Sequence, residues 1–189
     1  MNELFPVFLK ANQLRFLLIG GGKVAHEKLQ FIHKSSPHAG IDLVAPTILP
    51  EVFSLLKLFP ESTCFQRSFD IEDLVGKQLV IAATGNRELN LYLRDLANKY
   101  KFLLNVADQP DLCDFYLGGI VTKGDLKIGI STNGKSPILA KRLRETFEKI
   151  LPPSVEETIG ATNALRKKLH GNFDEKLRVL NEVTRGLVD

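Results

Sequence analysis

The sequence predicts an α/β fold: a doubly wound parallel sheet followed by a small β-hairpin and a helical C-terminal region. Short apolar runs alternate with segments of helical periodicity through residues 15–106, which is typical of a parallel sheet covered by helices on both faces. The alternation stops near residue 110. Two strand-like runs joined across Lys123-Gly124-Asp125 follow there, and three helical segments come after them.

The first part of the chain is expected to contain five strands and three helices. The predicted strands are short and mostly apolar, with a weaker signal for the third, and each predicted helix repeats its apolar residues every three or four positions. In the last of these helices, Leu89, Leu93, Leu96 and Tyr100 are expected to face inward. The expected strands are 15–19, 41–45, 64–67, 79–83 and 102–106, and the expected helices are 24–32, 51–58 and 88–100.

The second part is expected to begin with a hairpin of strands 115–122 and 126–131. Ser136-Pro137 reads as an N-cap and a first-turn proline, and it opens a helix that ends before Pro152-Pro153. Two helices broken near residues 171–172 complete the chain. The expected domains are therefore 1–112, 113–150 and 151–189. Since a hairpin and three helices make a small core, we expect a homodimer formed through residues 113–150.

Composition indicates a soluble, cytoplasmic protein of 189 residues, of which 44% are apolar and 25% charged. No apolar run is long enough to suggest a membrane span, and the N-terminus lacks the features of a secretory signal. Cys64 and Cys113 are too few for a disulfide framework. Residues 113–189 hold 13 Lys and Arg against 10 Asp and Glu. This excess is too diffuse for a nucleic-acid tract, and charge alone fits a small polyanionic ligand and a solvated basic surface equally well.

A turn of three glycines after the first strand suggests a dinucleotide site. Gly20, Gly22 and Ala25 fit the pattern G-x-G-x-x-A, in which the glycines allow a tight turn and close approach of a pyrophosphate. An ordinary strand-to-helix turn is the alternative. The second strand ends without an acidic or arginine residue, which favours NAD over NADP only mildly. The predicted cofactor residues are Gly20, Gly21, Gly22, Lys23, Val24, Ala25, Pro46, Thr47, Ala83 and Thr84.

Five ordered segments carry a resemblance to a known family. They are LFPVFLK at 4–10, LLIGGGKVAHEKL at 17–29, LVIAATGNRELN at 79–90, NVADQPDLCDF at 105–115 and ISTNGKSPILAKRLRE at 130–145. Together they resemble the precorrin-2 dehydrogenase/sirohydrochlorin ferrochelatase family, the siroheme-forming enzymes. The resemblance covers residues 2–150, while the tail matches in layout only.

The resemblance implies an NAD-dependent oxidation of precorrin-2 to sirohydrochlorin. It also implies a Rossmann-type domain, a dimerisation region and a helical C-terminal region in a homodimer. Some members of the family insert ferrous iron into the product as well, so iron would be a substrate. The resemblance further implies that Asp108, in the N-V-x-D motif, is the catalytic residue. From its position alone, Asp108 could equally form the turn before Gln109-Pro110.

The loop at residues 131–136 is a candidate substrate site. It joins a strand to a helix N-terminus and offers hydroxyls, backbone N–H groups and a lysine, which suit the carboxylates of a tetrapyrrole. Capping of the helix by Ser136 is compatible with that role. The four histidines show no metal-ligand spacing, so no resident metal is expected. The predicted substrate residues are Ser131, Thr132, Asn133, Gly134, Lys135 and Ser136.

Three alternatives stay open. The chain could be a dehydrogenase that lacks the iron-inserting activity, and a non-catalytic NAD-sensing module would account for the glycine turn alone. A different NAD oxidoreductase would need its own catalytic residues, but the sequence holds no Tyr-x-x-x-Lys pair.

Overall fold

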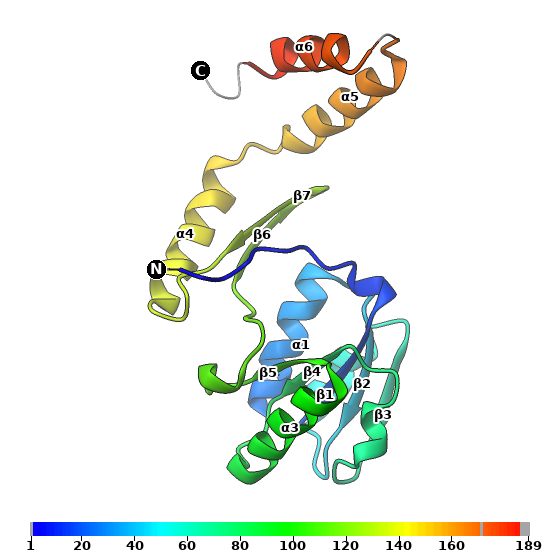
Figure 1. The fold of residues 1–189 in the computed structure, drawn as a ribbon, viewed down its shortest axis with the longest axis vertical. Coiled ribbons are helices and arrows are strands. Elements are labelled where there is room, and N and C mark those ends of the chain that lie inside the picture. Colours follow the sequence, from blue (N-terminus) through cyan, green and yellow to red (C-terminus); the bar gives the residue numbers. More distant parts are fainter. Residues whose placement is uncertain (1, 171, 186–189) are drawn as a thin grey trace. The chain divides into compact units, whose positions relative to one another are not determined.

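The computed structural model describes residues 2–170 and 172–185, and the chain forms two compact units that divide after Leu117 (Figure 1). None of the helices in the described ranges is both long and apolar enough to cross a bilayer.

The first unit is built on a five-stranded parallel sheet in the order β3-β2-β1-β4-β5 (Figure 1). The connection from β3 to β4 carries the chain back across the sheet, so that β1 and β4 are neighbours. The carboxyl ends of these two strands form the switch point of a doubly wound fold, where ligands of such sheets bind. The elements are β1 (Arg15–Ile19), α1 (Lys23–Ser35), β2 (Gly40–Val44), α2 (Pro50–Leu56), β3 (Ser62–Phe65), β4 (Leu79–Ala82), α3 (Arg87–Tyr100) and β5 (Leu103–Val106), with 3₁₀ turns at Ala11–Gln13, Ile71–Leu74 and Pro110–Leu112.

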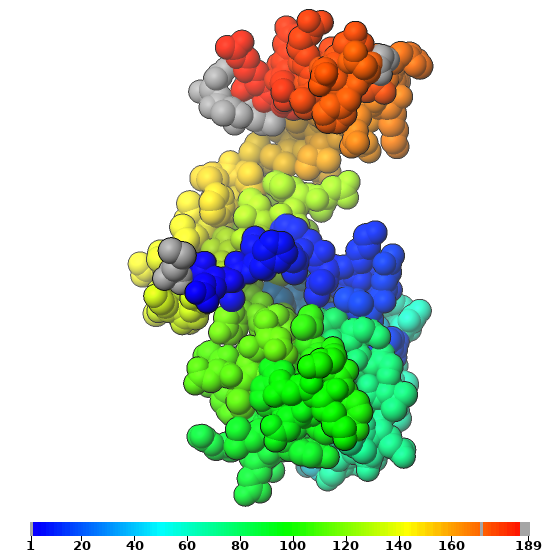
Figure 2. Space-filling view, in the orientation of Figure 1, coloured from blue at the N-terminus to red at the C-terminus, as the bar shows by residue number. Residues whose placement is uncertain are grey.

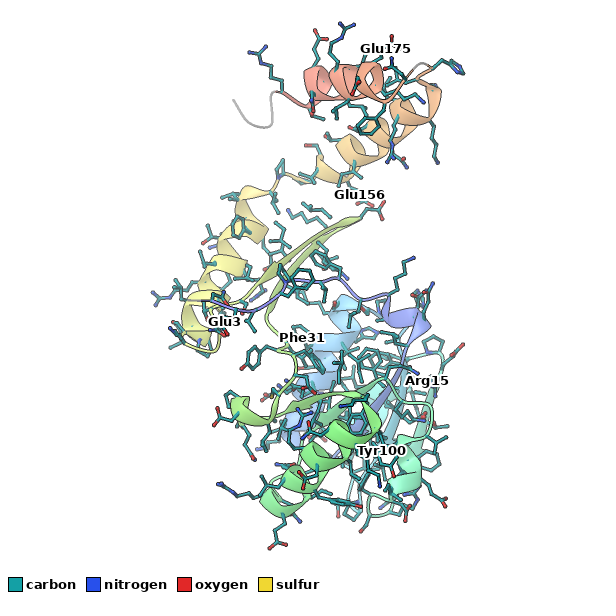
Figure 3. All side chains as sticks on the ribbon, viewed as in Figure 1. Glu3, Arg15, Phe31, Tyr100, Glu156 and Glu175 are labelled. Atoms are coloured by element: carbon teal, nitrogen blue, oxygen red, sulfur yellow. The ribbon has the colours of Figure 1, made fainter. Side chains whose placement is uncertain are left out.

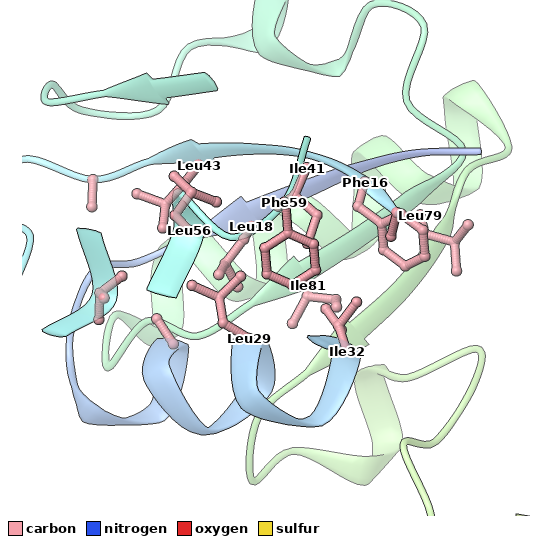
Figure 4. Close-up of a cluster of buried hydrophobic side chains, with 14 residues drawn as sticks. Phe16, Leu18, Leu29, Ile32, Ile41, Leu43, Leu56, Phe59, Leu79 and Ile81 are labelled. Carbon is pink, nitrogen blue, oxygen red and sulfur yellow. The ribbon is translucent and has the colours of Figure 1, made fainter. Parts of the chain in front are cut away.

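Each face of the sheet carries its own apolar core. On one face, buried residues of α1 and α2 pack against alternate residues of the strands, with Leu29 and Val52 fully buried (Figure 4). The other strand residues point to the opposite face. There, Leu17 of β1 and Val80 of β4 pack against Leu93 and Leu96 of α3. Since both faces are covered, the strands read as continuous apolar runs rather than as alternating patterns.

A cluster of charges crosses the strands of this sheet. Asp42 of β2 is buried and accepts hydrogen bonds from Thr63 and from Arg15, whose Nη2 lies 2.7 Å away. Lys77 Nζ lies 2.9 Å from the other carboxylate oxygen. Burial raises the pKa of Asp42, but the hydrogen bonds from Thr63 and Lys77 and the two positive charges lower it more, so that the pKa lies below its ordinary value.

The second unit contains an antiparallel hairpin and three helices. The strands β6 (Gly119–Lys123) and β7 (Leu126–Ile130) pair across the turn, and α4 (Pro137–Ile150), α5 (Val155–Lys168) and α6 (Phe173–Thr184) follow. Glu156 of α5 lies against Gly124 in the turn, where a Cβ would overlap its side chain (Figure 3). Among the described residues of this unit, Val121 is the only buried hydrophobic side chain.

The fold class is confirmed, and several element predictions need correction. The third strand spans 62–65 rather than 64–67, and residues 115–118 are not part of the hairpin strand. Tyr100 is 51% exposed rather than inside, because α3 ends there with Lys101 in the left-handed conformation (Figure 3). The expected helix break falls between α5 and α6, but residue 171 lies outside the described part of the chain.

The N-terminal segment is apolar and exposed, a feature that the sequence prediction did not include. Residues 2–10 form no helix or strand, and the segment lies on the surface, drawn in dark blue in Figure 2. Its large apolar side chains are between 38% and 85% exposed: Leu4, Phe5, Val7, Phe8 and Leu9.

Candidate functional site

The glycine turn is held between two neighbouring loops. Gly20 has a φ of 119°, a conformation that side chains rarely adopt, and a Cβ there would overlap the carbonyl of Ala83 after β4. A Cβ at Gly21 would overlap the carbonyl of Thr47 after β2. The backbone explains both contacts, because Ala83 N–H donates to Ile19 C=O at 2.8 Å and Leu49 N–H donates to Gly21 C=O at 2.9 Å. Packing alone therefore requires two of the three glycines.

Gly22 differs because nothing lies within 4 Å of the position its Cβ would take. It is the N-cap of α1, and no side chain caps the helix there. The backbone N–H groups of the first turn are therefore available to a ligand, and the helix dipole favours an anion. Ala25, fully buried, lets α1 pack closely against the sheet. Lys23 and Val24 form the first turn of α1. This open, uncapped helix start fits the pyrophosphate of a dinucleotide.

The loop after β4 is fixed by a residue that sequence reasoning missed. Asn90 of α3 is completely buried, and its Oδ1 accepts a hydrogen bond of 2.8 Å from Thr84 Oγ1. Asn86 caps α3 by accepting from Leu89 N–H. A polar residue beside Leu89 and Leu93, which were both expected to face inward, was a signal that could have found Asn90. Thr84, predicted as a cofactor residue, is thus held in place at the switch point.

The loop after β2 offers no charge to a ribose. Pro46 and Thr47 are exposed, as expected of contact residues. Arg67 follows the neighbouring strand β3, whose Phe65 C=O accepts from Ala45 N–H at 3.1 Å. The guanidinium of Arg67 is engaged by Asp73 through two hydrogen bonds of 2.8 and 2.5 Å. The bond from Arg67 also lowers the pKa of Asp73 below its ordinary value.

Asp108 lies in the loop that leaves the carboxyl end of β5. Its φ of 59° is left-handed, which is uncommon for a residue other than glycine, although Asp adopts it more readily than most. Ala107 N–H continues the ladder to Ala82 C=O at 2.9 Å, and Gln109 N–H turns back to Val106 C=O. The side chain is exposed, and within the described ranges no residue hydrogen bonds to its carboxylate. A free carboxylate at this edge is suited to proton transfer.

The segment after Asp108 folds back along β5. Cys113 Sγ lies 3.2 Å from the amide nitrogen of Val106. Asp114 accepts a hydrogen bond from Leu104 N–H and pairs with Arg94 at 2.8 Å. Burial raises the pKa of the Cys113 thiol. Cys113 and Asp114 are residues whose contacts the sequence did not reveal.

The predicted substrate loop belongs to the second unit and is closed by its own hydrogen bonds. Asn133 and Gly134 both have positive φ. Ser131 Oγ accepts from Asn133 N–H, Thr132 Oγ1 accepts from Ser136 N–H, and Ser136 Oγ caps Leu139 N–H. Lys135 is exposed, and no described residue pairs with its ammonium group. Each of the three hydroxyl oxygens therefore accepts a hydrogen bond within the turn, and Lys135 supplies the positive charge of the loop.

The structure brings the predicted cofactor residues and Asp108 to one edge of the sheet in the first unit. The predicted substrate residues at 131–136 lie in the other unit. Across residues 2–170 and 172–185, no group of three His, Cys, Asp or Glu side chains is arranged to hold a metal ion.

Comparisons with known proteins agree with this geometry. Residues 7–119 match the family described as Putative NAD(P)-binding, and residues 123–150 match the one described as Sirohaem biosynthesis protein central. The chain is 32% identical over 93% of its length to a siroheme synthase of Thioalkalivibrio sulfidiphilus, and 37% identical over 79% to one of Nitrosomonas eutropha. It covers 36% and 31% of these proteins, so it spans about a third of the curated relatives that it matches.

A solved structure titled "SirC, precorrin-2 dehydrogenase" has the same fold. It superposes with a TM-score of 0.73 at 22% identity and covers 95% of this chain and 89% of its own. The resemblance to the siroheme-forming enzymes, which five sequence segments suggested, is confirmed by these similarities.

Proposed function

Because the chain belongs to the family of putative NAD(P)-binding proteins, we propose that it is a dehydrogenase that oxidises precorrin-2 to sirohydrochlorin. One observation carries the proposal. The free carboxylate of Asp108 lies at the same edge of the sheet as the open, uncapped start of α1 at Gly22. In this proposal the dinucleotide site and the proton acceptor lie on two loops at the same edge of the sheet, with the loop after β4 between them. Similarity to siroheme synthases supports the choice of substrate.

The residues of the glycine turn hold the dinucleotide in this proposal. The N–H groups of Gly22, Lys23 and Val24 bind the pyrophosphate, and the loop of Ala83 and Thr84 borders the nicotinamide. When bound, the dinucleotide supplies the acceptor for a hydride. Asn90 keeps Thr84 in place through the 2.8 Å hydrogen bond.

Asp108 accepts the proton that leaves the macrocycle with the hydride. Oxidation of a C–H bond next to a nitrogen heterocycle removes a hydride and a proton, and the proton needs a base. A positioned general base contributes about 10²–10⁴ in rate. The exposed carboxylate of Asp108 has no competing partner in the described part of the chain.

We propose NAD rather than NADP as the cofactor. A 2′-phosphate needs a cation beside the end of β2, where Pro46 and Thr47 carry none. Arg67 on the adjacent strand end is already paired with Asp73. We further propose that the protein is a cytoplasmic homodimer. We also propose that Lys135, in the 131–136 loop, binds a carboxylate of the tetrapyrrole.

Asp108→Asn tests the function, with Asp111→Asn as the matched control. Both aspartates are exposed on the same loop, and neither substitution changes the size of the side chain appreciably. We expect Asp108→Asn to lower kcat for precorrin-2 oxidation about 10²–10⁴-fold because the base is lost. The affinity for NAD, measured by titration, should stay within about 2-fold, and Asp111→Asn should keep both.

Normal turnover by folded Asp108→Asn would rule out the catalytic role, and failure of the unmodified protein to oxidise precorrin-2 would refute the function. Binding of NAD without turnover would favour the sensing module. Assaying iron insertion into sirohydrochlorin with the same three proteins decides whether the second activity is present and whether it needs the same carboxylate.

A further inference from the structure

The outer edge of β5 is closed by side chains rather than by another strand. β5 is the last strand of the sheet, so that its outward backbone groups would otherwise be open. Asp114 N–H donates to Leu104 C=O at 2.7 Å, and Asp114 Oδ2 accepts from Leu104 N–H at 2.9 Å. Two residues further along β5, Cys113 Sγ accepts a hydrogen bond from Val106 N–H at 3.2 Å. The thiol therefore takes the place of a ladder carbonyl.

Cys113 also reaches the other end of the loop. Its Sγ lies 3.3 Å from Val106 C=O and 3.4 Å from Gln109 C=O. A thiol has one proton, so it donates to one of these carbonyls at a time while its sulfur accepts from Val106 N–H. Asn105 adds a hydrogen bond of 2.8 Å to Phe115 C=O, which fastens the chain beyond the thiol. Residues 106–109 thus form a small loop whose two ends meet at one sulfur.

Asp108 is at the tip of this loop and depends on it. Its left-handed φ of 59° is uncommon for a residue other than glycine. Such a conformation persists only where the surroundings impose it. Since none of the described residues hydrogen bonds to the Asp108 carboxylate, the backbone constrains this side chain through the direction of its Cα–Cβ bond. The hydrogen bond from Gln109 N–H to Val106 C=O at 3.4 Å closes this turn, and the contacts at Cys113 tie both of its ends to the segment that follows.

We propose that Cys113 is a positioning residue for the reaction: its thiol closes the loop that aims the Asp108 carboxylate. This inference rests on the proposed function, because it assigns Cys113 an effect on catalysis through Asp108. A burial-raised pKa keeps the thiol protonated at neutral pH, so that it retains the proton it donates. Cys113 takes no part in the redox step.

The test compares Cys113→Ala with Cys113→Ser and uses Cys64→Ala as the control. Cys64 is the other half-buried thiol, on β3 at the opposite edge of the sheet. Cys113→Ala removes the hydrogen bonds that the thiol donates and those that its sulfur accepts from Val106 N–H and Asn105 Nδ2, and we expect kcat for precorrin-2 oxidation to fall about 10–100-fold. The KM for precorrin-2 and the affinity for NAD should change less than about 2-fold. Cys113→Ser keeps a donor and an acceptor on a shorter bond and should recover part of the loss. Cys64→Ala should behave like the unmodified protein.

A double-mutant cycle separates positioning from a general loss of structure. If Cys113 acts only through Asp108, adding Cys113→Ala to Asp108→Ala should cost less than about 2-fold more. Single-turnover rates with enzyme in excess keep the residual activity measurable. Hydrogen exchange supplies a readout without catalysis: the amide of Val106, which donates to the sulfur, should exchange faster in Cys113→Ala, while the amide of Val80 in β4 should not change.

Two results would overturn the inference alone: full kcat in folded Cys113→Ala beside an impaired Asp108→Ala, or an equal loss from Cys113→Ala with and without Asp108. Full activity of Asp108→Ala would instead overturn the proposed catalytic role, and this inference with it. The two failures are therefore distinguishable.

Discussion

The three adjacent glycines of the β1–α1 turn are constrained by different neighbours. Gly20 and Gly21 are required because the carbonyls of Ala83 and Thr47 occupy the space that a Cβ would need. Gly22 has free space instead, and it lies at the uncapped start of α1. Two glycines therefore serve packing, whereas the absence of a side chain at Gly22 leaves room for a ligand.

Gly22→Asp is expected to remove NAD binding without unfolding the protein. The new carboxylate would lie where we place the pyrophosphate, and like charges at about 4 Å repel by a few kcal/mol near a protein surface. The dissociation constant for NAD should rise at least about 100-fold, which corresponds to about 2.7 kcal/mol. Isothermal titration measures it, and far-UV circular dichroism checks the fold.

Gly160→Asp is the control for that substitution, because Gly160 of α5 also has no atom near its missing Cβ. It should bind NAD as the unmodified chain does. Unchanged affinity in folded Gly22→Asp would instead remove the pyrophosphate assignment.

Sequence reasoning could predict the local geometry of the candidate site. Gly22 and Ala25 follow from their spacing after a strand, since the turn geometry is set by adjacent residues. Asn90 and Cys113 could not be assigned partners, although these lie only six and seven residues away, because the path of the intervening loop brings Asn90 to Thr84 and Cys113 to Val106. Spacing alone does not encode such contacts.

At the scale of elements, apolar runs in the sequence located the strands, but hydrogen bonding to the neighbouring strand determined the residues at which each strand begins and ends. β3 spans 62–65 because Ser62 to Phe65 pair with Ile41 to Val44 of β2, and the short run at 64–67, in which only Cys64 and Phe65 are apolar, did not indicate that register. Residues 115–117 look like a strand because Phe115 and Leu117 are apolar, but these side chains pack on the core beside α1. In a short segment, apolar residues can mean either that the side chains are buried in a core or that the backbone belongs to a sheet, and the sequence alone does not distinguish the two.

The charge cluster across β1, β2 and β3 predicts an acid-dependent stability. The pKa of Asp42 is lower in the folded protein than in the unfolded chain, so its ionised form stabilises the fold above about pH 4. That contribution is lost as the pH falls through the folded-state pKa. Asp42→Asn leaves Lys77 without its carboxylate and should cost about 1–3 kcal/mol at pH 7. The difference from the unmodified protein should shrink below about pH 4.

Urea unfolding at pH 7 and pH 3.5 measures this difference, with Glu61→Gln as the control. Glu61 lies 3.5 Å from Arg15, but its side chain is 76% exposed, so the substitution should change stability by less than about 0.5 kcal/mol at either pH. A cost of Asp42→Asn that stays constant down to pH 3.5 would contradict the role of its charge.

At the scale of the whole molecule, the two units differ in how many apolar side chains each buries within itself. The first unit buries apolar side chains on both faces of its sheet, whereas the described part of the second buries only Val121. On α4, four large apolar residues are exposed by between 38% and 70%: Ile138, Leu139, Leu143 and Ile150. A helix with such a face gains stability by burying it against another chain.

We therefore expect a homodimer formed through the second unit, with α4 at the interface. In a two-fold interface each residue acts twice, once from each copy, so one substitution places two charges in the contact. Leu139→Glu should raise the dimer dissociation constant by at least about 100-fold, because a carboxylate must lose its water there. Leu139 is 49% exposed within one chain, so a single copy should keep its fold.

Leu58→Glu is the control, since Leu58 is 57% exposed in the first unit. Sedimentation velocity at micromolar concentration should give twice the chain mass of 21.1 kDa for the unmodified protein and Leu58→Glu, and the single mass for Leu139→Glu. A stable monomer in the unmodified protein would refute the dimer, and a Leu139→Glu protein that stays dimeric would place the interface on another surface.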